Sequence, residues 1–289
     1  MTPSAFEYHK AESLEHAVAL LDQFGEDGRP LAGGQSLVPM MNLRLARPRY
    51  LVDINGLGLG AIELDGQTLK IGALVRHEQY LSNTIIATHY PAFLDGVQAI
   101  GHPTIRRNGT TGGSLSHADP TAELPLLSIL HDAQIVAASV RGERKIAATD
   151  FFEGAYMTTL QAGEMIARIE LPIPPSPSAG AFVEFGERRG DFAIAAGAVT
   201  LAFADGRISR ASVACSGAAQ TAIRAPDIEA ALVGLPIEHP ESRHHVKAFA
   251  ASLSPPDDHS ASADYRRALI EELLQRAISI ACARATETS

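Results

Sequence analysis

The sequence predicts an α+β protein, and the turns between its apolar runs are the clearest reason. Asp65-Gly66 separates apolar runs at 61–64 and 67–73, and Asp205-Gly206 separates runs at 193–204 and 207–215. An Asp-Gly pair between two such runs is the strongest short-range signal for an antiparallel hairpin. In the last third of the chain, the strand patterns precede the helical patterns instead of alternating with them. This order favours an antiparallel sheet with its helices segregated.

Length and composition set the broad class. The chain has 289 residues, of which 46% are hydrophobic and 20% charged, so we expect a soluble protein of two or three domains. The stretch from Leu171 to Ser178 contains four prolines and cannot form a helix or a central strand. We therefore predict a domain boundary in this stretch, with subdomains at 1–56 and 57–176 before it and a C-terminal α+β domain at 177–289.

Charge and cysteine content exclude several classes of function. The net charge of −9 argues against nucleic acid or an anionic membrane surface as a partner. No apolar run approaches the roughly 20 residues of a membrane span, and the N-terminus lacks the pattern of a signal peptide. Cys215 and Cys282 lie far apart, and the histidines form no paired pattern with them. We expect free thiols, no zinc or iron–sulfur site in this chain, and a cytoplasmic location.

The N-terminal elements follow from periodicity and caps. Apolar residues recur on one helical face between 14 and 21, with Ser13 placed to cap the helix and Gly25 to end it. A short apolar strand from Tyr50 to Ile54 closes a small βαβ-like unit. The Gly33-Gly34 loop lacks GxGxxG spacing and is not followed by a clear helix, which disfavours a Rossmann fold.

The remaining elements are predicted from the same patterns. A helix should begin with Pro91 in its first turn and run to residue 100. Further helices are expected at 124–130, 227–233 and 265–283. Strands are expected at 134–139 and 165–171, in addition to the two hairpins.

Two glycine loops are the candidate ligand-binding elements. The first is Ala32-Gly33-Gly34-Gln35-Ser36, and the second lies within the stretch from Thr104 to Leu124, TIRRNGTTGGSLSHADPTAEL. Adjacent glycines remove side chains where backbone N–H groups approach a ligand, flanking hydroxyls add donors, and the helix start beyond favours an anion. Either loop alone is more often a plain turn. Two loops of the same kind suggest one extended diphosphate ligand held from two sides.

These stretches resemble a known family. LAGGQSLVPMMNLRLARPRYLVDI (31–54) and IRRNGTTGGSLSHADPTAE (105–123) are similar to the two FAD signatures of the flavoprotein medium subunit of molybdenum hydroxylases. That group includes the carbon monoxide dehydrogenase medium subunit and the flavin domain of xanthine dehydrogenase. The similarity extends from Phe6-Glu7-Tyr8 to Tyr265-Arg266-Arg267. It implies a vanillyl-alcohol-oxidase-like (PCMH-type) FAD-binding domain followed by a C-terminal domain of antiparallel strands and helices.

The resemblance also implies which residues contact FAD. In the family both glycine loops lie along the pyrophosphate, and other positions contact the ribityl, adenosine or ring parts. The positions implied here are Ala32, Gly33, Gly34, Gln35, Ser36, Leu37, Ile100, Thr110, Thr111, Gly112, Gly113, Ser114, Glu123, Ile166, Glu184 and Phe192. No residue of this chain is expected to act as a catalytic acid or base, because electron transfer at the flavin requires none.

The sequence departs from the family pattern at four of these positions. Thr111 and Ser114 stand where relatives often carry isoleucine and asparagine, and both are small and polar. Glu123 stands where aspartate is common. Glu184 stands where xanthine dehydrogenase has a lysine near the flavin; a carboxylate there disfavours the anionic reduced flavin. The alternative for Glu184 is a solvated strand residue.

Other polar residues have competing interpretations. Arg106 and Arg107 either neutralise phosphate or face a partner subunit, or are simply solvated. We expect a structural role for His117 and Asp119 rather than a proton shuttle.

The aromatic residue and the histidines are weaker candidates for a functional site than the glycine loops. The segment Arg188-Arg189-Gly190-Asp191-Phe192 matches a family segment that passes over the isoalloxazine, although an aromatic residue in an apolar strand is more often part of a core. His244-His245 is expected at the surface, and His77 is expected to be an ordinary loop or strand-edge residue.

The function implied by the resemblance is electron transfer. FAD, bound non-covalently, takes electrons from two-iron two-sulfur clusters of a small partner and passes them to an external acceptor. A large partner carries molybdopterin, and the assembly is a dimer of heterotrimers. The alternatives are a self-contained FAD-dependent oxidase or reductase and a flavin-free assembly scaffold. The first has little room for a substrate domain in 289 residues, and intact glycine loops argue against the second.

Overall fold

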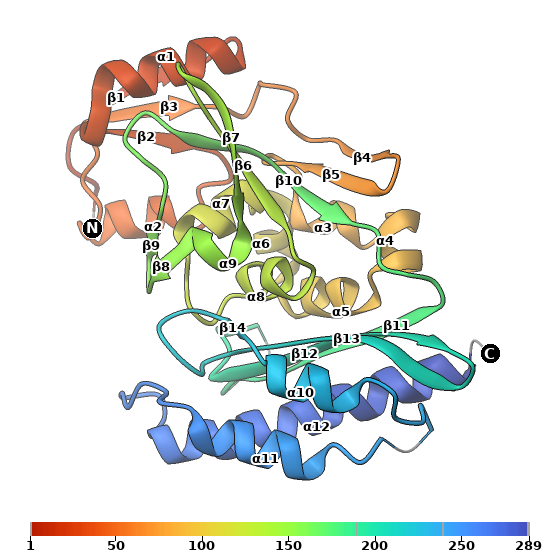
Figure 1. The fold of residues 1–289 in the computed structure, drawn as a ribbon. Helices are drawn as coiled ribbons and strands as arrows, with labels where there is room; N and C mark the ends of the chain where they lie inside the picture. Colours follow the sequence, from red (N-terminus) through yellow and green to blue (C-terminus); the bar gives the residue numbers. More distant parts are fainter. Residues whose placement is uncertain (1, 189, 239, 288–289) are drawn as a thin grey trace.

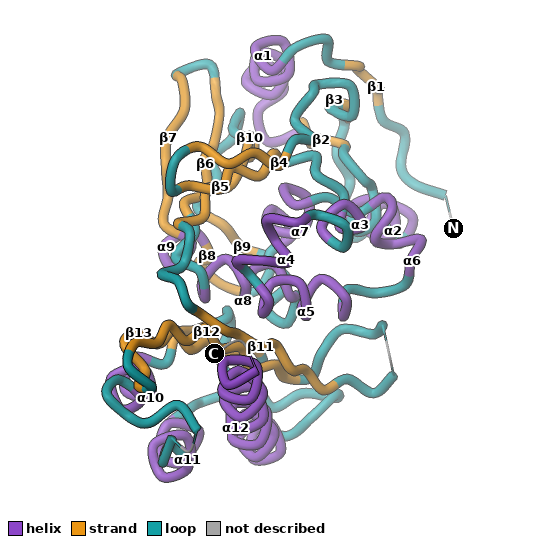
Figure 2. Tube along the Cα trace, turned by 90° about the vertical axis from the view of Figure 1, so that its right-hand side faces the viewer, coloured by secondary structure: helices purple, strands orange, loops and turns teal. Residues whose placement is uncertain are grey.

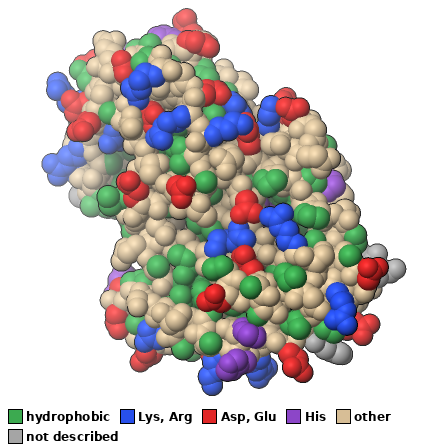
Figure 3. Space-filling model, viewed as in Figure 1, with side chains coloured by type: hydrophobic (Ala, Val, Ile, Leu, Met, Phe, Trp, Pro, Cys, Tyr) green, Lys and Arg blue, Asp and Glu red, His purple; other side chains and the backbone are tan. Residues whose placement is uncertain are grey.

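A computed structural model describes residues 2–188, 190–238 and 240–287. The chain forms three sheets stacked from the N-terminus to the C-terminus, with a layer of short helices between the second and the third (Figures 1 and 2). Within the described residues, no helix is long and apolar enough to cross a membrane. Acidic and basic side chains are interspersed over the face shown in Figure 3.

The first sheet is the small βαβ-like unit that the sequence predicts. Its strands are parallel in the order β1-β3-β2, and helix α1 has Ser13 as its N-cap, whose hydroxyl accepts from the amide of His16 at 3.1 Å. The helix ends at Gly25, as predicted. The elements are β1 (Glu7–Lys10), α1 (Leu14–Phe24), η1 (Gly25–Asp27), β2 (Gly28–Leu31), α2 (Leu37–Asn42) and β3 (Tyr50–Asp53). The first glycine loop leads into the six-residue helix α2, which the sequence pattern did not indicate clearly.

The second sheet is antiparallel, in the order β4-β5-β10-β6-β7. Both the Asp65-Gly66 hairpin and the strand predicted at 134–139 are confirmed. The strands are β4 (Ile62–Asp65), β5 (Thr68–Gly72), β6 (Gln134–Ser139), β7 (Gly142–Ala147) and β10 (Met165–Pro172), with a small hairpin of β8 (Phe152–Gly154) and β9 (Met157–Thr158). The helices are α3 (His77–Tyr80), α4 (Thr84–His89), α5 (Pro91–Ala99), α6 (Pro103–Asn108), α7 (Thr111–His117), α8 (Glu123–Leu130) and α9 (Ala148–Phe151).

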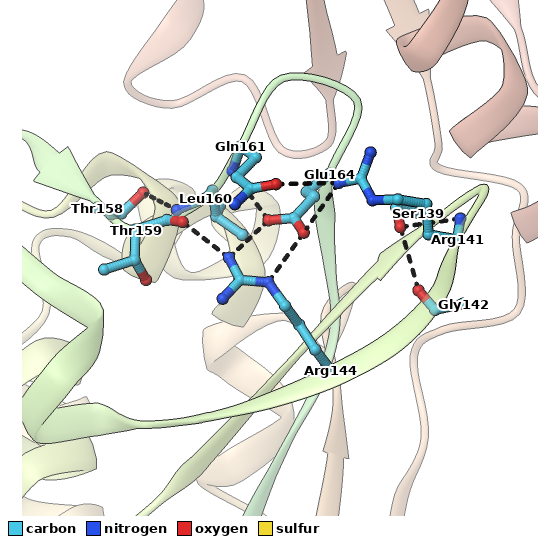
Figure 4. A network of polar contacts seen from close by, with 9 residues as sticks. All are labelled: Ser139, Arg141, Gly142, Arg144, Thr158, Thr159, Leu160, Gln161 and Glu164. Atoms are coloured by element: carbon cyan, nitrogen blue, oxygen red, sulfur yellow. Dashed lines mark hydrogen bonds and ion pairs between the residues drawn. The ribbon is translucent and has the colours of Figure 1, made fainter.

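A buried carboxylate joins the β6–β7 hairpin to the loop that precedes β10 (Figure 4). Glu164, with its side chain 3% exposed, accepts hydrogen bonds from Nε and Nη2 of Arg144 at 2.9 and 2.8 Å. It also accepts from the Gln161 amide at 2.8 Å, and Arg144 donates to the Thr159 carbonyl at 2.8 Å. Burial opposes ionisation of Glu164, but these hydrogen bonds outweigh it and hold the pKa of the carboxyl below its usual range.

The third sheet is antiparallel in the order β11-β12-β13-β14, with its helices at the end of the chain, so the α+β prediction is confirmed. Helix α12 packs against β11 and β12, while α5 and α8 cover the opposite face (Figure 1). The elements are β11 (Ser178–Phe185), β12 (Ala195–Ala204), β13 (Arg207–Ser216), β14 (Ile223–Arg224), α10 (Pro226–Leu232), α11 (Arg243–Ser252) and α12 (Ala263–Glu287).

The hydrophobic core is continuous across the proline-rich linker. Phe182 and Ala196 of the third sheet belong to one buried cluster with Phe93 of α5 and Leu127 of α8. Gly96 of α5 allows this approach, because a Cβ there would lie 2.9 Å from the Leu127 side chain. The second and third sheets, with the helices between them, therefore share one packed hydrophobic core. The domain limits proposed at residues 56 and 176 stay a prediction.

Candidate cofactor-binding site

The two glycine loops lie directly against each other. A Cβ on Gly33 would lie only 1.9 Å from the carbonyl oxygen of Asn108, which is the last residue of α6. Asn108 is followed by Gly109 and by Thr110, the N-cap of α7. Two stretches far apart in sequence thus meet backbone to backbone, as the idea of one ligand held from two sides requires.

The first loop presents free amide groups. Among the described residues, the N–H groups from Gly33 to Leu37 have no hydrogen-bond acceptor. Gly34 has a φ of +69°, a backbone conformation that residues other than glycine rarely adopt. This conformation turns the chain into α2. Val38 is the first residue of this region whose amide is bonded, to the Gly34 carbonyl at 3.1 Å. A run of free N–H groups before a helix is suited to bind an anion.

The second loop is the first turn of helix α7. The Thr111 amide donates to the Val75 carbonyl at 3.0 Å, and the Gly112 amide donates to the Ala73 carbonyl at 2.8 Å. The Gly113 amide donates to the Thr110 hydroxyl oxygen at 3.2 Å. These three amides are therefore occupied within the protein. Gly112 also lets α7 pack on Ala73, and contact of Thr111, Gly112 and Gly113 with FAD stays a prediction.

The hydroxyl groups of this loop differ in accessibility. Thr111 is fully buried, and its hydroxyl bonds to the Tyr80 hydroxyl and donates to the Val75 carbonyl at 3.3 Å. It supports the loop from inside, and its contact with FAD stays a prediction. Ser114 is half-buried and Gly113 is exposed. The Ser114 hydroxyl and the open surface at Gly113 are what α7 presents to a ligand.

His77 lies beneath the second loop. It is 4% exposed, and a Cβ on Gly109 would lie 2.6 Å from its imidazole ring. Burial lowers the pKa of His77 to about 4, with smaller contributions from the positive charges of Arg76 and Arg106. The imidazole is therefore neutral at pH 7. The prediction of an ordinary loop residue is wrong, and His77 is a buried support of the loop.

The segment after β11 lies against the turn that follows α5. Gly190, at φ of +90°, packs on His102, since a Cβ there would lie 2.8 Å from the His102 ring. Phe192 is 59% exposed, and Ile100, the C-cap of α5, is 7% exposed. Phe192 is therefore a surface residue rather than part of a core. Arg189 lies outside the described residues.

The arginine pair of the central stretch is engaged within the protein. Arg106 donates through Nη1 to the carbonyls of Ile100 and Gly101 at 2.7 and 2.9 Å. Arg107 forms an exposed ion pair with Glu78 at 3.2 Å. Arg106 thus holds the turn beside Ile100, and neither guanidinium is without a partner.

Leu37 and Ile166 are two further positions at which the family resemblance implies contact with FAD. Leu37 is half-buried at the start of α2. Ile166 is 2% exposed and lies at a β-bulge in β10, where the register with β6 shifts. Its side chain belongs to the core, and its contact with FAD stays a prediction.

Two carboxyl groups, those of Glu123 and Glu184, come from different elements and lie near enough for the charge of Glu184 to act on Glu123. Glu123 is the first residue of α8 and is 7% exposed, while Glu184 lies on β11 with a buried Oε2 that has no hydrogen-bond partner among the described residues. Burial, with smaller contributions from the negative charges of Glu184 and Asp119, raises the pKa of Glu123 to about 8. Burial raises the pKa of Glu184 to about 7. Glu184 is therefore not a solvated strand residue.

This pair predicts a pH dependence of stability. Both carboxyls have folded-state pKa values above the ordinary value of 4.5, so the folded chain binds more protons than the unfolded chain between these values. Their stabilising contribution is complete below pH 4.5 and is lost as the pH rises through about 7 and 8. We expect urea unfolding of the flavin-free chain to show this fall, and Glu123→Gln to flatten it. Glu187→Gln, at an exposed position on the same segment, is the control. Equal slopes in all three proteins would contradict the inference.

His117 and Asp119 have a structural role, as expected. Oδ1 of Asp119 accepts from the amide and hydroxyl of Thr121 at 2.9 and 2.8 Å, and Oδ2 accepts from the Tyr156 hydroxyl at 2.9 Å. The His117 ring packs against Tyr156 with centroids 5.1 Å apart. Both carboxylate oxygens of Asp119 are thus used to fix the turn between α7 and α8.

The described residues contain no group of three side chains able to hold a metal ion. Cys215 and Cys282 are buried free thiols, and burial raises the pKa of Cys282 to about 11. His244 and His245 are exposed on α11, as predicted. The residues that sequence reasoning missed near the loops are Asn55 and Arg76, which belong to neither glycine motif.

Comparison with known proteins covers the whole chain. Residues 4–174 match the family described as FAD binding domain in molybdopterin dehydrogenase, and residues 180–281 match the CO dehydrogenase flavoprotein C-terminal domain. The chain is 39% identical to the 6-hydroxypseudooxynicotine dehydrogenase complex subunit alpha of Paenarthrobacter nicotinovorans, with coverage of 100% of this chain and 98% of the relative. It is 35% identical to the carbon monoxide dehydrogenase medium chain of Afipia carboxidovorans, with 99% coverage of both.

Solved structures agree with these relationships. The carbon monoxide dehydrogenase of Hydrogenophaga pseudoflava superposes with a TM-score of 0.92 at 37% identity, over 98% of this chain and 99% of that chain. The quinoline 2-oxidoreductase of Pseudomonas putida 86 superposes with a TM-score of 0.93 at 34% identity, over 99% of both chains. Identity above 30% along the full length, with both family regions in order, shows that this chain belongs to the FAD-binding medium subunits of molybdenum hydroxylases.

Proposed function

We propose that this chain binds FAD without a covalent bond and carries electrons within a molybdenum hydroxylase. Electrons enter from two-iron two-sulfur clusters of a small partner subunit and leave to an external acceptor. The observation that carries this proposal is the contact of Gly33 with Asn108, which brings the free amides of the first loop beside the start of α7. This arrangement suits one diphosphate bound by both loops.

The donors at the site fit FAD. The site offers uncharged hydrogen-bond donors, which are the N–H groups from Gly33 to Leu37 and the Ser114 hydroxyl. Such donors bind a diphosphate without a positively charged side chain. Gly113 is exposed and leaves room for a ligand beside α7. Bound FAD supplies the one- and two-electron chemistry, while this chain orients the cofactor and sets its electrostatic surroundings.

The surroundings of the ring are expected to be acidic. Glu123 and Glu184 stand where the family resemblance implies FAD contacts, and their raised pKa values let them hold protons near neutral pH. The resemblance places Glu184 near the flavin ring and Glu123 near the ribityl or adenosine part of the cofactor, where each is able to hold a proton near neutral pH. Phe192 is exposed and available to cover one face of the ring.

The partners are proposed from the names of the relatives. Carbon monoxide dehydrogenase medium chain and nicotine 6-hydroxylase medium subunit are names of one component of a larger enzyme. We propose a large molybdopterin subunit, a small iron–sulfur subunit and a dimer of the resulting heterotrimers. This chain has only two cysteines, and both are buried, so we place the iron–sulfur clusters in the small partner subunit. Free thiols agree with a cytoplasmic location.

The binding test is direct. We expect the purified chain to contain about one FAD that is released on acid denaturation, because the first loop contains neither His nor Cys and His77 is buried under Gly109. The measurement is the flavin absorbance of the supernatant and of the pellet after acid precipitation. Flavin that stays with the pellet would refute non-covalent binding, and a colourless protein that takes up no added FAD would refute the proposed function.

A further inference from the structure

Asn55 anchors the first glycine loop through its carbonyl groups. It lies just after β3, and its Nδ2 donates to the Ala32 carbonyl at 3.0 Å and to the Leu31 carbonyl at 3.3 Å. The peptide bond is planar and trans, so the N–H group of Gly33 points opposite to the Ala32 carbonyl. Fixing that carbonyl on Asn55 therefore directs the Gly33 amide away from Asn55.

Arg76 connects Asn55 to the second loop. Its Nη2 donates to Oδ1 of Asn55 at 2.6 Å, and its Nη1 donates to the carbonyl of Asn108. This is the same carbonyl against which Gly33 packs. The backbone of Arg76 forms a single β-bridge with Thr110, and its amide donates to Oε1 of Gln79 at 2.7 Å. Arg76 is thus fixed at both its backbone and its guanidinium.

We propose that Asn55 and Arg76 are positioning residues that set the spacing and orientation of the two glycine loops for one diphosphate. The guanidinium uses two nitrogen atoms for two different partners, one on each side, which the single nitrogen of lysine cannot reproduce. The half-buried positive charge lies against the Asn108 carbonyl. The inference rests on the proposed FAD function, and its failure can be distinguished from failure of that function.

The test compares FAD affinity in four forms of the full-length chain depleted of flavin. Asn55→Ala removes the donor to Ala32 and the acceptor for Arg76 without placing a second carboxylate beside Asp53, whose Oδ1 accepts from Asn55 Nδ2 at 2.7 Å. Arg76→Lys keeps the charge but loses the bridge. Each should raise the Kd for FAD about tenfold or more, because a charge-assisted or loop-orienting hydrogen bond is lost. Arg107→Lys is the matched control, since Arg107 is exposed and pairs only with Glu78 in the same region. Titration is followed by flavin fluorescence.

A double variant separates positioning from general stability. If Asn55 and Arg76 act as one unit, the Kd of the double variant should be close to that of the worse single variant. Urea unfolding of the flavin-free variants should change little by comparison. Additive losses in affinity that follow losses in stability would overturn the proposal, as would a change in Kd of less than about threefold in both single variants. A wild-type chain that does not bind FAD would instead refute the proposed function.

Discussion

Gly33→Ala is expected to abolish FAD binding under ordinary assay conditions. Its Cβ would lie 1.9 Å from the Asn108 carbonyl oxygen and 2.7 Å from the carbonyl carbon, so the obstacle is backbone and cannot rotate away. The two loops must separate by more than an ångström, which misplaces the free amides of the first loop. Losing two hydrogen bonds to a charged group weakens binding by about a hundredfold.

The measurement is the FAD content of the purified variant and its Kd by fluorescence titration. Gly60→Ala is the control, because a Cβ there meets nothing within 4 Å and the position lies outside both loops. Circular dichroism and urea unfolding establish that the variant still folds. Full flavin content in folded Gly33→Ala would show that the contact between the loops does not position the cofactor.

Gly113 is the informative comparison. A Cβ at this position would lie 2.7 Å from the Thr110 hydroxyl oxygen, which is the end of a side chain rather than backbone. Gly113 is also not among the glycines with positive φ. Its substitution by alanine therefore disturbs the N-cap of α7, at a cost of about 1 kcal/mol, and should affect FAD binding less than Gly33→Ala. The two neighbouring motifs thus use glycine for different physical reasons.

Elements with a strong local signal could be predicted from sequence. Helix α1 begins after Ser13 and ends at Gly25 because both caps are local, and strand β6 coincides with the predicted residues 134–139. The Asp65-Gly66 and Asp205-Gly206 hairpins are also present, since the turn residues determine them. The C-terminal helix predicted at 265–283 from its apolar face is also present, as α12, which spans Ala263–Glu287.

The short helices around the site could not be predicted in this way. Helices α3 and α7 contain four and seven residues, too few to be stable without tertiary contacts. In α7, Gly112 and Gly113 have poor helix propensity, and the helix forms because its first amides bond to Ala73 and Val75. The contacts of Arg76 with Asn55 and Asn108 join distant parts of the chain, so no local pattern reveals them.

The largest functional effect should appear when electrons are supplied by substrate. We expect the lone chain with bound FAD to remain oxidised when mixed anaerobically with N-heterocycles, aldehydes or carbon monoxide. It has no group of metal-binding side chains within its described residues, and both of its cysteines are buried and separate. In the proposed function, electrons from such substrates reach the flavin through partner subunits. Dithionite should still bleach the flavin, which establishes that the cofactor is competent.

Adding the molybdopterin and iron–sulfur partners should restore bleaching by the substrate of the complex, followed by flavin absorbance under anaerobic conditions. Gly33→Ala provides the matched control, because a subunit that lacks FAD leaves the partner clusters reduced without an outlet to the external acceptor. This combination distinguishes loss of the cofactor from loss of assembly. Rapid bleaching of the lone chain by any of these substrates would overturn the proposed role and favour a self-contained flavoenzyme, since the substrate site would then lie in this chain.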